Sequence, residues 1–165
     1  MKTAIIVSSI AVITAVGAEA PVPTPETIAK TYATTLTRLT DKPKAIGPEF
    51  ATLCSDIPAR NKYGPHAYHY VHHYRNESAQ LSRGNFAPGS VLVKEKLEGS
   101  GKDDALVVSL VTGMIKQPAG TSPKTGDWQF FVSRDGKVET DKMESCAGCH
   151  SGAKRDYVFT DIPKR

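Results

Sequence analysis

The sequence predicts an α+β protein in which a small antiparallel β-sheet follows one longer N-terminal helix, with short helices elsewhere. Apolar residues recur at helical spacing near the start of the chain, which is typical of an amphipathic helix. Further along, runs rich in β-branched and aromatic residues are separated by glycine and proline, which is typical of strands. A motif of two cysteines and a histidine follows the last of these runs, close to the C-terminus.

The helix is predicted over residues 25–40. Thr24 is a suitable N-cap, and Pro25 suits the first helical position because its missing N–H is not needed there. The apolar residues at nearly helical spacing are Ile28, Tyr32, Leu36 and Leu39. The proline-containing residues 41–64 are expected to form an irregular connection.

Four strands are predicted after this connection. They are expected at residues 67–74, 90–97, 106–116 and 127–132. Asn76 is expected to cap a short helix over residues 76–81. Turns are expected at residues 84–89, 99–104 and 118–126. Asp135-Gly136 is a tight-hairpin signal that leads into Val138.

The segment Cys146-Ala147-Gly148-Cys149-His150 has the spacing of the c-type haem attachment motif. Each cysteine would form a thioether bond to one vinyl group of the porphyrin, and His150 would bind the iron as the proximal axial ligand. We therefore expect one covalent haem c, bound near the C-terminus of the fold. The segment is also expected to start a short helix.

Two other interpretations of the motif are less well supported. A structural zinc site needs about four ligands, whereas this chain has three cysteines and Cys54 lies far from the other two. A thioredoxin-like dithiol is expected within a βαβ pattern, and here a histidine follows directly after the second cysteine. Cys54 is expected to be a buried thiol, since free cysteine behaves as a small hydrophobic residue.

Residues 1–20 have the pattern of a secretory signal peptide. Lys2 precedes the short apolar run 4–16, and small residues follow, with cleavage expected after Ala18 or Ala20. The run is shorter than the roughly 20 residues of a membrane span, which argues against an uncleaved anchor. The mature chain, residues 21–165, is then a single domain that is periplasmic or otherwise exported, with no membrane attachment after cleavage.

The charge pattern does not indicate a nucleic-acid-binding protein. The formal net charge is +4, and the lysines and arginines are spread along the chain without a dense basic block. A solvated surface explains these charges, as does a weakly basic face for an acidic redox partner.

Three blocks of sequence together resemble the cytochrome P-460 family, including its cytochrome c′-beta relatives. They are residues 86–97 (FAPGSVLVKEKL), residues 126–131 (GDWQFF), and the CAGCH motif followed by residues 156–159 (DYVF). Their order and spacing fit the family across roughly residues 60–160. The resemblance implies an antiparallel-sheet fold with one c-type haem, whose iron is five-coordinate with a histidine on one side and an open distal pocket.

The resemblance also implies a role for Lys94. Cytochromes P-460 proper oxidise hydroxylamine and have a covalent bond from a lysine to the porphyrin, and Lys94 aligns with that lysine. The c′-beta relatives lack the bond and bind nitric oxide and similar diatomic molecules. On a strand, Leu92, Lys94 and Lys96 would share one face, and a lysine there is ordinarily exposed to solvent.

The sequence departs from the hydroxylamine-oxidising members in two places. Those members have an arginine facing the iron on the first sheet strand, whereas here the nearest arginine is Arg75 at the far end. They also have a distal carboxylate on the strand after the lysine, but residues 105–126 contain no aspartate or glutamate. A histidine can take the place of this base, because its ordinary pKa is near neutrality.

Further ligands are offered by histidines and methionines. The first strand region contains His66, His69, His72 and His73. They suggest a second metal site, residues of the distal pocket or surface, or a sixth iron ligand. Met114 is expected in the core, and Met143 lies too close to the cysteine motif to reach the opposite side of the haem.

Two functions remain open at this point. The first is a haem protein with an open distal site that acts on small nitrogen species, either as a hydroxylamine-oxidising enzyme or as a binder of nitric oxide. The second is a six-coordinate electron-transfer cytochrome c with no substrate of its own. Either would exchange electrons with a redox protein, and the resemblance adds the expectation of a homodimer.

Overall fold

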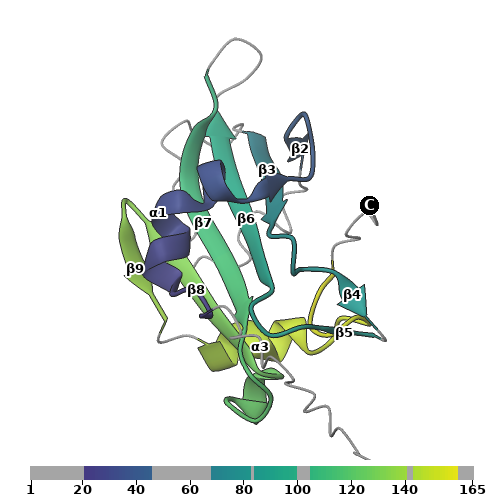
Figure 1. The fold of residues 1–165 in the computed structure, drawn as a ribbon. Helices are drawn as coiled ribbons and strands as arrows, with labels where there is room; N and C mark the ends of the chain where they lie inside the picture. Colours follow the sequence, from purple (N-terminus) through teal and green to yellow (C-terminus); the bar gives the residue numbers. More distant parts are fainter. Residues whose placement is uncertain (1–20, 46–67, 83, 100–104, 141–142, 160–165) are drawn as a thin grey trace, which may run out of the picture.

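The computed structural model describes residues 21–45, 68–82, 84–99, 105–140 and 143–159 (Figure 1). The predicted signal peptide, Cys54 and His66 lie outside these ranges, as do most of the predicted connection 41–64 and residues 100–104 of the predicted turn 99–104. None of the helices within the described ranges is long and apolar enough to cross a membrane.

The central element is a seven-stranded sheet in which every neighbouring pair is antiparallel (Figure 1). Its strands are β1 (Thr37–Arg38), β2 (Lys44–Ala45), β3 (Tyr68–Arg75), β6 (Val91–Gly99), β7 (Val107–Lys116), β8 (Trp128–Arg134) and β9 (Lys137–Glu139). They lie in the order β1-β3-β6-β7-β8-β9, and β2 also pairs with β3. The α+β class, the four predicted strands and the hairpin at Asp135-Gly136 are thereby confirmed, with strand ends moved by one or two residues.

Short elements complete the described fold. The strands β4 (Leu81–Ser82) and β5 (Asn85–Phe86) form a separate two-stranded sheet, and a 3-10 helix, η1, spans Pro123–Thr125. Among the described residues, α-helices are found at α1 (Pro25–Thr35) and α3 (Met143–His150).

Helix α1 begins where the sequence predicts but ends earlier. The Thr24 side chain accepts a hydrogen bond from the backbone N–H of Thr27 (3.3 Å), so the predicted N-cap is confirmed. The predicted extension to residue 40 is wrong, because Leu36 is extended (ψ 151°). The chain after it pairs with β3 as β1, which replaces helical hydrogen bonds by sheet hydrogen bonds.

The helix predicted over residues 76–81 is also absent. The Asn76 side-chain oxygen accepts hydrogen bonds from the N–H groups of Ala79 (3.1 Å) and Val91 (2.9 Å). Its amide donates to the carbonyl of Gly89 (2.7 Å). Asn76 therefore makes a turn and ties it to the start of β6, instead of capping a helix.

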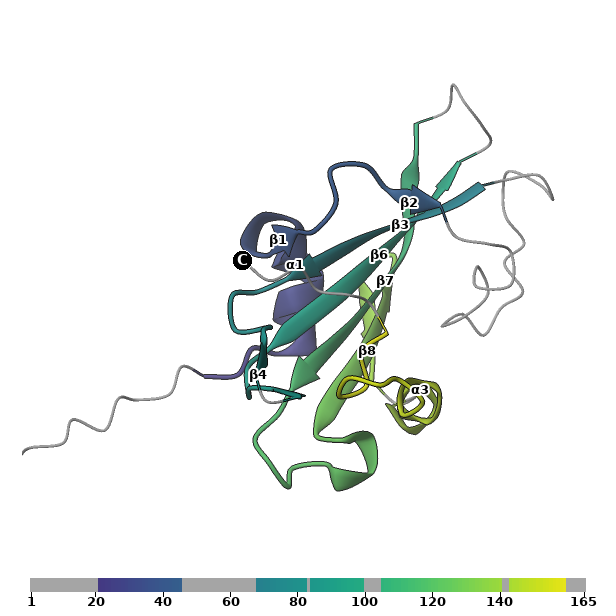
Figure 2. The same cartoon turned by 90° about the vertical axis from the view of Figure 1, so that its right-hand side faces the viewer.

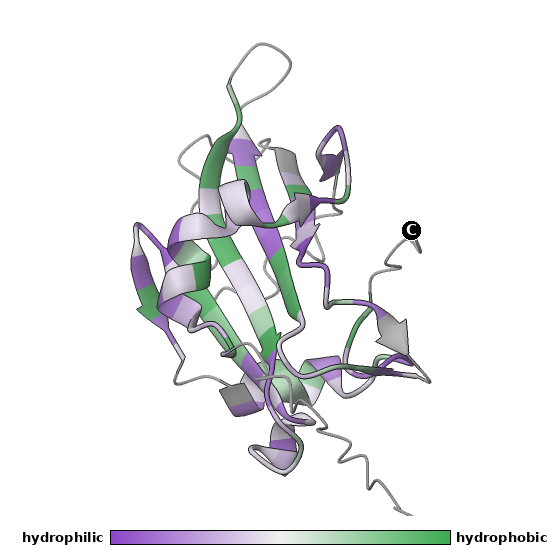
Figure 3. Cartoon of the chain, in the orientation of Figure 1, coloured by the Kyte–Doolittle hydropathy of each residue, from purple (hydrophilic) through white to green (hydrophobic). Residues whose placement is uncertain are grey.

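The two helices cover opposite faces of the sheet (Figure 2). Helix α1 packs on β7, β8 and β9, whereas α3 packs on β8 and η1. Figure 3 shows that β6 is apolar at its start and polar in its middle. Over residues 91–95 buried and half-buried side chains alternate, as the period-2 geometry of a strand requires. We call the two surfaces the α1 face and the α3 face of the sheet.

Each face has its own apolar cluster. The cluster on the α1 face contains Ile28, Tyr32, Tyr74, Val91, Val93, Val111, Ile115 and Phe131. The cluster on the α3 face contains Ala79, Phe86, Met114, Trp128, Phe130, Ala147 and Val158. Met114 is thus a core residue, as predicted. Full burial of one such large side chain contributes about 1.5–3 kcal/mol, so the two clusters are the main stabilising contacts of the sheet.

A buried carboxylate lies on the α1 face. Glu95 on β6 accepts hydrogen bonds from the hydroxyl groups of Tyr32 (2.5 Å) and Tyr74 (3.1 Å). Burial is the main cause that raises the pKa of both tyrosines, and the neighbouring Glu95 raises it further. Glu95 is therefore engaged on the side of the sheet opposite α3.

Candidate haem site

The cysteine and histidine motif forms the second half of α3, so a short helix is present as predicted, but the motif ends this helix instead of starting it. Residues three apart lie on the same side of a helix, which places Cys146 and Cys149 next to each other. Cys149 is exposed and Cys146 is half-buried, and no disulfide joins them. Ala147 between them is buried in the apolar cluster of the α3 face. The helix is therefore anchored through Ala147 while both thiols remain in reach of a ligand.

The imidazole of His150 is held in a defined orientation. Its Nδ1 atom lies 2.7 Å from the backbone carbonyl oxygen of Tyr157. Because a carbonyl only accepts hydrogen bonds, Nδ1 carries the proton and Nε2 is the nitrogen left to bind a metal. The ring contacts those of Phe130 and Phe159, at centroid distances of 5.2 and 5.5 Å. Burial, the largest cause, lowers the pKa of His150, which favours the neutral ring that metal binding requires.

The Tyr157 carbonyl belongs to a tight turn over residues 155–158. The N–H of Val158 donates to the carbonyl of Arg155 (2.8 Å), and the two central residues have positive φ angles, 42° at Asp156 and 67° at Tyr157. This is the left-handed region, which costs a non-glycine residue on the order of 1 kcal/mol. The turn therefore needs stabilising contacts from outside.

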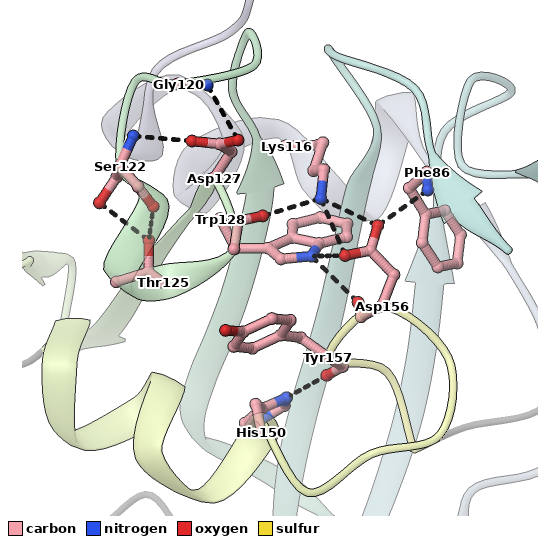
Figure 4. Close-up of polar contacts among 11 residues, drawn as sticks. Phe86, Lys116, Gly120, Ser122, Thr125, Asp127, Trp128, His150, Asp156 and Tyr157 are labelled. Carbon is pink, nitrogen blue, oxygen red and sulfur yellow. Dashed lines mark hydrogen bonds and ion pairs between the residues drawn. The ribbon is translucent and has the colours of Figure 1, made fainter.

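Those contacts converge on Asp156 (Figure 4). Its carboxylate accepts hydrogen bonds from the Nζ of Lys116 (2.9 Å to each oxygen), the N–H of Phe86 (2.9 Å) and the indole N–H of Trp128 (3.2 Å). The indole also donates to the Asp156 backbone carbonyl (3.0 Å). The turn is thus attached to β5, β7 and β8.

The Tyr157 ring packs against Gly126, and Lys116 binds the backbone of Gly126. A Cβ atom on Gly126 would lie 2.2 Å from the Tyr157 ring, so only glycine fits there, and its φ of 62° also favours glycine. The Gly126 carbonyl accepts a hydrogen bond from Lys116 Nζ (2.8 Å), which also lies 5.0 Å from the centroid of the Trp128 ring. A single lysine therefore connects Gly126, Trp128 and Asp156.

Lys94 and His73 lie on the α3 face, opposite each other on β6 and β3. The positive charge of Lys94 lowers the pKa of both His150 and His73, so Lys94 is close enough to act on both rings. Burial, the largest cause, together with Lys94 and then Lys44, lowers the pKa of His73 to about 4. His73 is therefore neutral at physiological pH, which is the form in which a histidine binds a metal, and it is a weak base.

Of the remaining histidines, only His72 has a side chain among the described parts of the structure. His72 lies on the α1 face, where its Nδ1 is 3.0 Å from the Thr40 hydroxyl, and burial is the main cause that lowers its pKa. His66 and the side chain of His69 lie outside the described parts of the structure. Across the described residues, no three histidine, cysteine, aspartate or glutamate side chains come together as metal ligands. The second metal site considered from the sequence gains no support there.

Sequence reasoning missed Asp156, Lys116 and Trp128 as parts of the site. Asp156 lies within the resembling block DYVF, but nothing in the local pattern indicates a left-handed turn at Asp156 and Tyr157. Asp156 meets Lys116 from 40 residues away and Phe86 from 70 residues away. Only the assembled sheet brings these groups together.

Comparison with known families now adds to the geometry. The family model described as Cytochrome P460 matches residues 51–160, which is two thirds of the chain. The chain belongs to the cytochrome P460 family. A search of curated proteins found no match. The family places this chain among haem-binding proteins of the c-type cytochrome kind.

The residues at the C-terminal end of α3 fit a haem. Two thiols at helical spacing are available for attachment, and the His150 ring is oriented with Nε2 left for iron. Phe159, beside His150, is 65% exposed, which is unusual for so large an apolar side chain. A porphyrin plane next to His150 is a surface of the kind that such an aromatic ring covers.

We predict that the free energy of unfolding falls as the pH is lowered from about 6.5 to about 4. The pKa of His73 is lowered to about 4 in the folded chain, so the unfolded chain binds the extra proton first in this range and stability rises with pH. His73→Gln should make the total fall in the free energy of unfolding over this pH range smaller, by no more than about 3 kcal/mol. Urea unfolding at a series of pH values measures this, and an unchanged slope in the variant would contradict it.

Proposed function

We propose that this protein is an exported mono-haem c-type cytochrome with an open distal site that binds small nitrogen species. Cys146 and Cys149 attach the haem by thioether bonds, and His150 is the proximal iron ligand. Haem supplies an iron atom that takes up small ligands or exchanges an electron. Nitric oxide and hydroxylamine are the ligands that family membership favours.

The orientation of His150 is the observation that carries this proposal. The hydrogen bond from Nδ1 to the Tyr157 carbonyl, 2.7 Å long, selects the tautomer in which Nε2 binds a metal. Metal-bound histidines almost always make such a bond with their second nitrogen. Helix α3 provides the two thiols on one side, directly before this histidine.

The α3 face of the sheet supplies the groups that act on a ligand. His73 is a neutral imidazole there, but its pKa of about 4 makes it a weak base for the protons that hydroxylamine oxidation releases. Glu95 is hydrogen-bonded to two tyrosines on the opposite face. Arg75 is buried at the end of β3, where its guanidinium donates to the carbonyl of Ala79 (3.1 Å). These positions support ligand binding more strongly than hydroxylamine oxidation.

A six-coordinate electron carrier is the second candidate, and His73 is the residue that favours it. A neutral imidazole on the α3 face is able to bind iron opposite His150. Met114 is packed against Trp128 and Phe130 in the core, which speaks against it as the sixth ligand. The two candidates therefore differ in whether His73 occupies the iron.

The expected location and partners follow from the rest of the chain. The signal-peptide pattern of residues 1–20 supports export, and c-type haem attachment is compatible with a periplasmic location. A redox protein is the expected electron partner, because an iron that changes oxidation state needs a donor or acceptor. A homodimer is the assembly that the family suggests.

We predict that the ferrous protein binds nitric oxide at once, with a shift of its Soret band. An open iron site needs no ligand to leave before nitric oxide enters. A slow reaction with sharp six-coordinate bands would contradict the open site.

The variants His73→Ala and His72→Ala then test whether His73 is the sixth iron ligand, since the two rings lie on opposite faces of β3. If His73 binds iron, only His73→Ala opens the site.

We further propose that the Lys94 amine is bonded to the porphyrin, as its place on the α3 face and its effect on the pKa of His150 suggest. Lys94→Ala should then shift the Soret band. After proteolysis of the wild-type protein, the peptide that contains Lys94 should stay joined to the haem peptide, whereas an unmodified lysine would give two separate peptides. Lys94→Arg is the matched control because it keeps the positive charge, and it should show the same shift of the Soret band as Lys94→Ala. An unchanged spectrum in both variants would end this idea.

A further inference from the structure

The turn over residues 155–158 adopts a conformation that its own residues do not favour. Asp156 and Tyr157 have φ angles of 42° and 67°, a region that residues other than glycine rarely adopt, although aspartate and asparagine do so more often than tyrosine. Such conformations persist where the surroundings hold them, and they gather at functional sites. The surroundings here are the contacts of Asp156 with Phe86, Lys116 and Trp128.

The pair of Lys116 and Asp156 is buried, with side-chain exposures of 12% and 6%. Taking two charges out of water costs about as much as their attraction returns, so a buried ion pair is weak grounds for stability alone. The pair instead fixes the position of the turn over residues 155–158. Three hydrogen-bond donors from three separate strands meet at one carboxylate, which leaves the turn one place to lie.

The position of the turn decides the position of the Tyr157 carbonyl. Asp156, which its contacts hold in place, is the residue directly before Tyr157. On the other side, the Gly126 backbone packs against the Tyr157 ring. Lys116 binds both of these, through the Asp156 carboxylate and the Gly126 carbonyl. The carbonyl then accepts the hydrogen bond from His150 Nδ1 (2.7 Å), as Figure 4 shows.

We propose that Asp156, together with Lys116, is a positioning residue for His150. By holding the Tyr157 carbonyl against Nδ1, the pair sets how strongly the imidazole donates to haem iron through Nε2. A hydrogen bond to the second nitrogen raises the basicity of a ligating histidine. A more basic imidazole favours ferric iron and lowers the reduction potential. The inference rests on the proposed role of His150 as the iron ligand.

The test uses Asp156→Asn in the haem-loaded protein. Asparagine tolerates a positive φ but has no charge, and it places an amide where one carboxylate oxygen receives its donors. The matched control is Asp127→Asn. Asp127 also has a positive φ (59°), but its carboxylate binds the N–H groups of Gly120 (3.0 Å) and Ser122 (2.8 Å) and none of the donors that hold Asp156.

Two quantities are measured: the reduction potential, and the iron–histidine stretching frequency of the ferrous protein by resonance Raman spectroscopy. We expect Asp156→Asn to raise the potential and lower the frequency, because Nδ1 loses a fixed acceptor. Asp127→Asn should leave both at the wild-type values. If Asp156→Asn lowers only the melting temperature, with potential and frequency unchanged, the residue is merely structural and the inference is overturned.

A second pair of variants decides the matter if Asp156→Asn does not fold. Lys116→Arg keeps the charge opposite Asp156, whereas Lys116→Met removes it. We expect a raised potential and a lowered frequency in Lys116→Met and a return towards wild type in Lys116→Arg. Equal values in both overturn the inference. Failure of the proposed function is seen separately, because the wild-type protein would then lack an iron–histidine band.

Discussion

The hydrogen bond between His150 and the Tyr157 carbonyl is the contact on which the haem-site arrangement depends. It selects the imidazole tautomer, and it joins α3 to the turn that follows it. Asp156 attaches this turn to the sheet. Through these contacts, the position of the His150 ring depends on strands β7 and β8. Second contacts of this kind orient and tune ligating histidines in proteins generally.

The sheet separates two sets of polar groups by the alternation of its side chains. On β6, Glu95 points to the α1 face and is satisfied by Tyr32 and Tyr74, whereas Lys94 points to the α3 face. On β3, His72 and His73 are divided in the same way. A shift of register by one residue would exchange the two sets. The buried carboxylate is thus kept away from the haem motif, and the neutral imidazole of His73 is kept with it.

The parts of this structure that depend on local pattern could be read from the sequence. The strands are runs rich in β-branched and aromatic residues, α1 begins at a threonine cap with proline next to it, and the hairpin at Asp135-Gly136 needs only its two turn residues. The spacing of Cys146, Cys149 and His150 likewise predicted a haem motif without any knowledge of the fold.

Features that depend on distant partners could not be read in this way. The end of α1 is decided by pairing of residues 37–38 with β3, and Asn76 is drawn into a turn by the start of β6. The left-handed turn at Asp156 exists because donors from 28 to 70 residues away meet its carboxylate. Propensity gives such positions no signal, since the contacts that stabilise them are made only after the sheet forms.

The central claim is that one haem is bonded to Cys146 and Cys149 on the helix whose last residue is His150. The most direct measurement is the mass of the denatured mature protein, made in a host that matures c-type cytochromes. The account predicts the mass of the amino acids plus one haem, and the loss of that haem in the double variant Cys146→Ala, Cys149→Ala. A wild-type mass equal to that of the amino acids alone would contradict it.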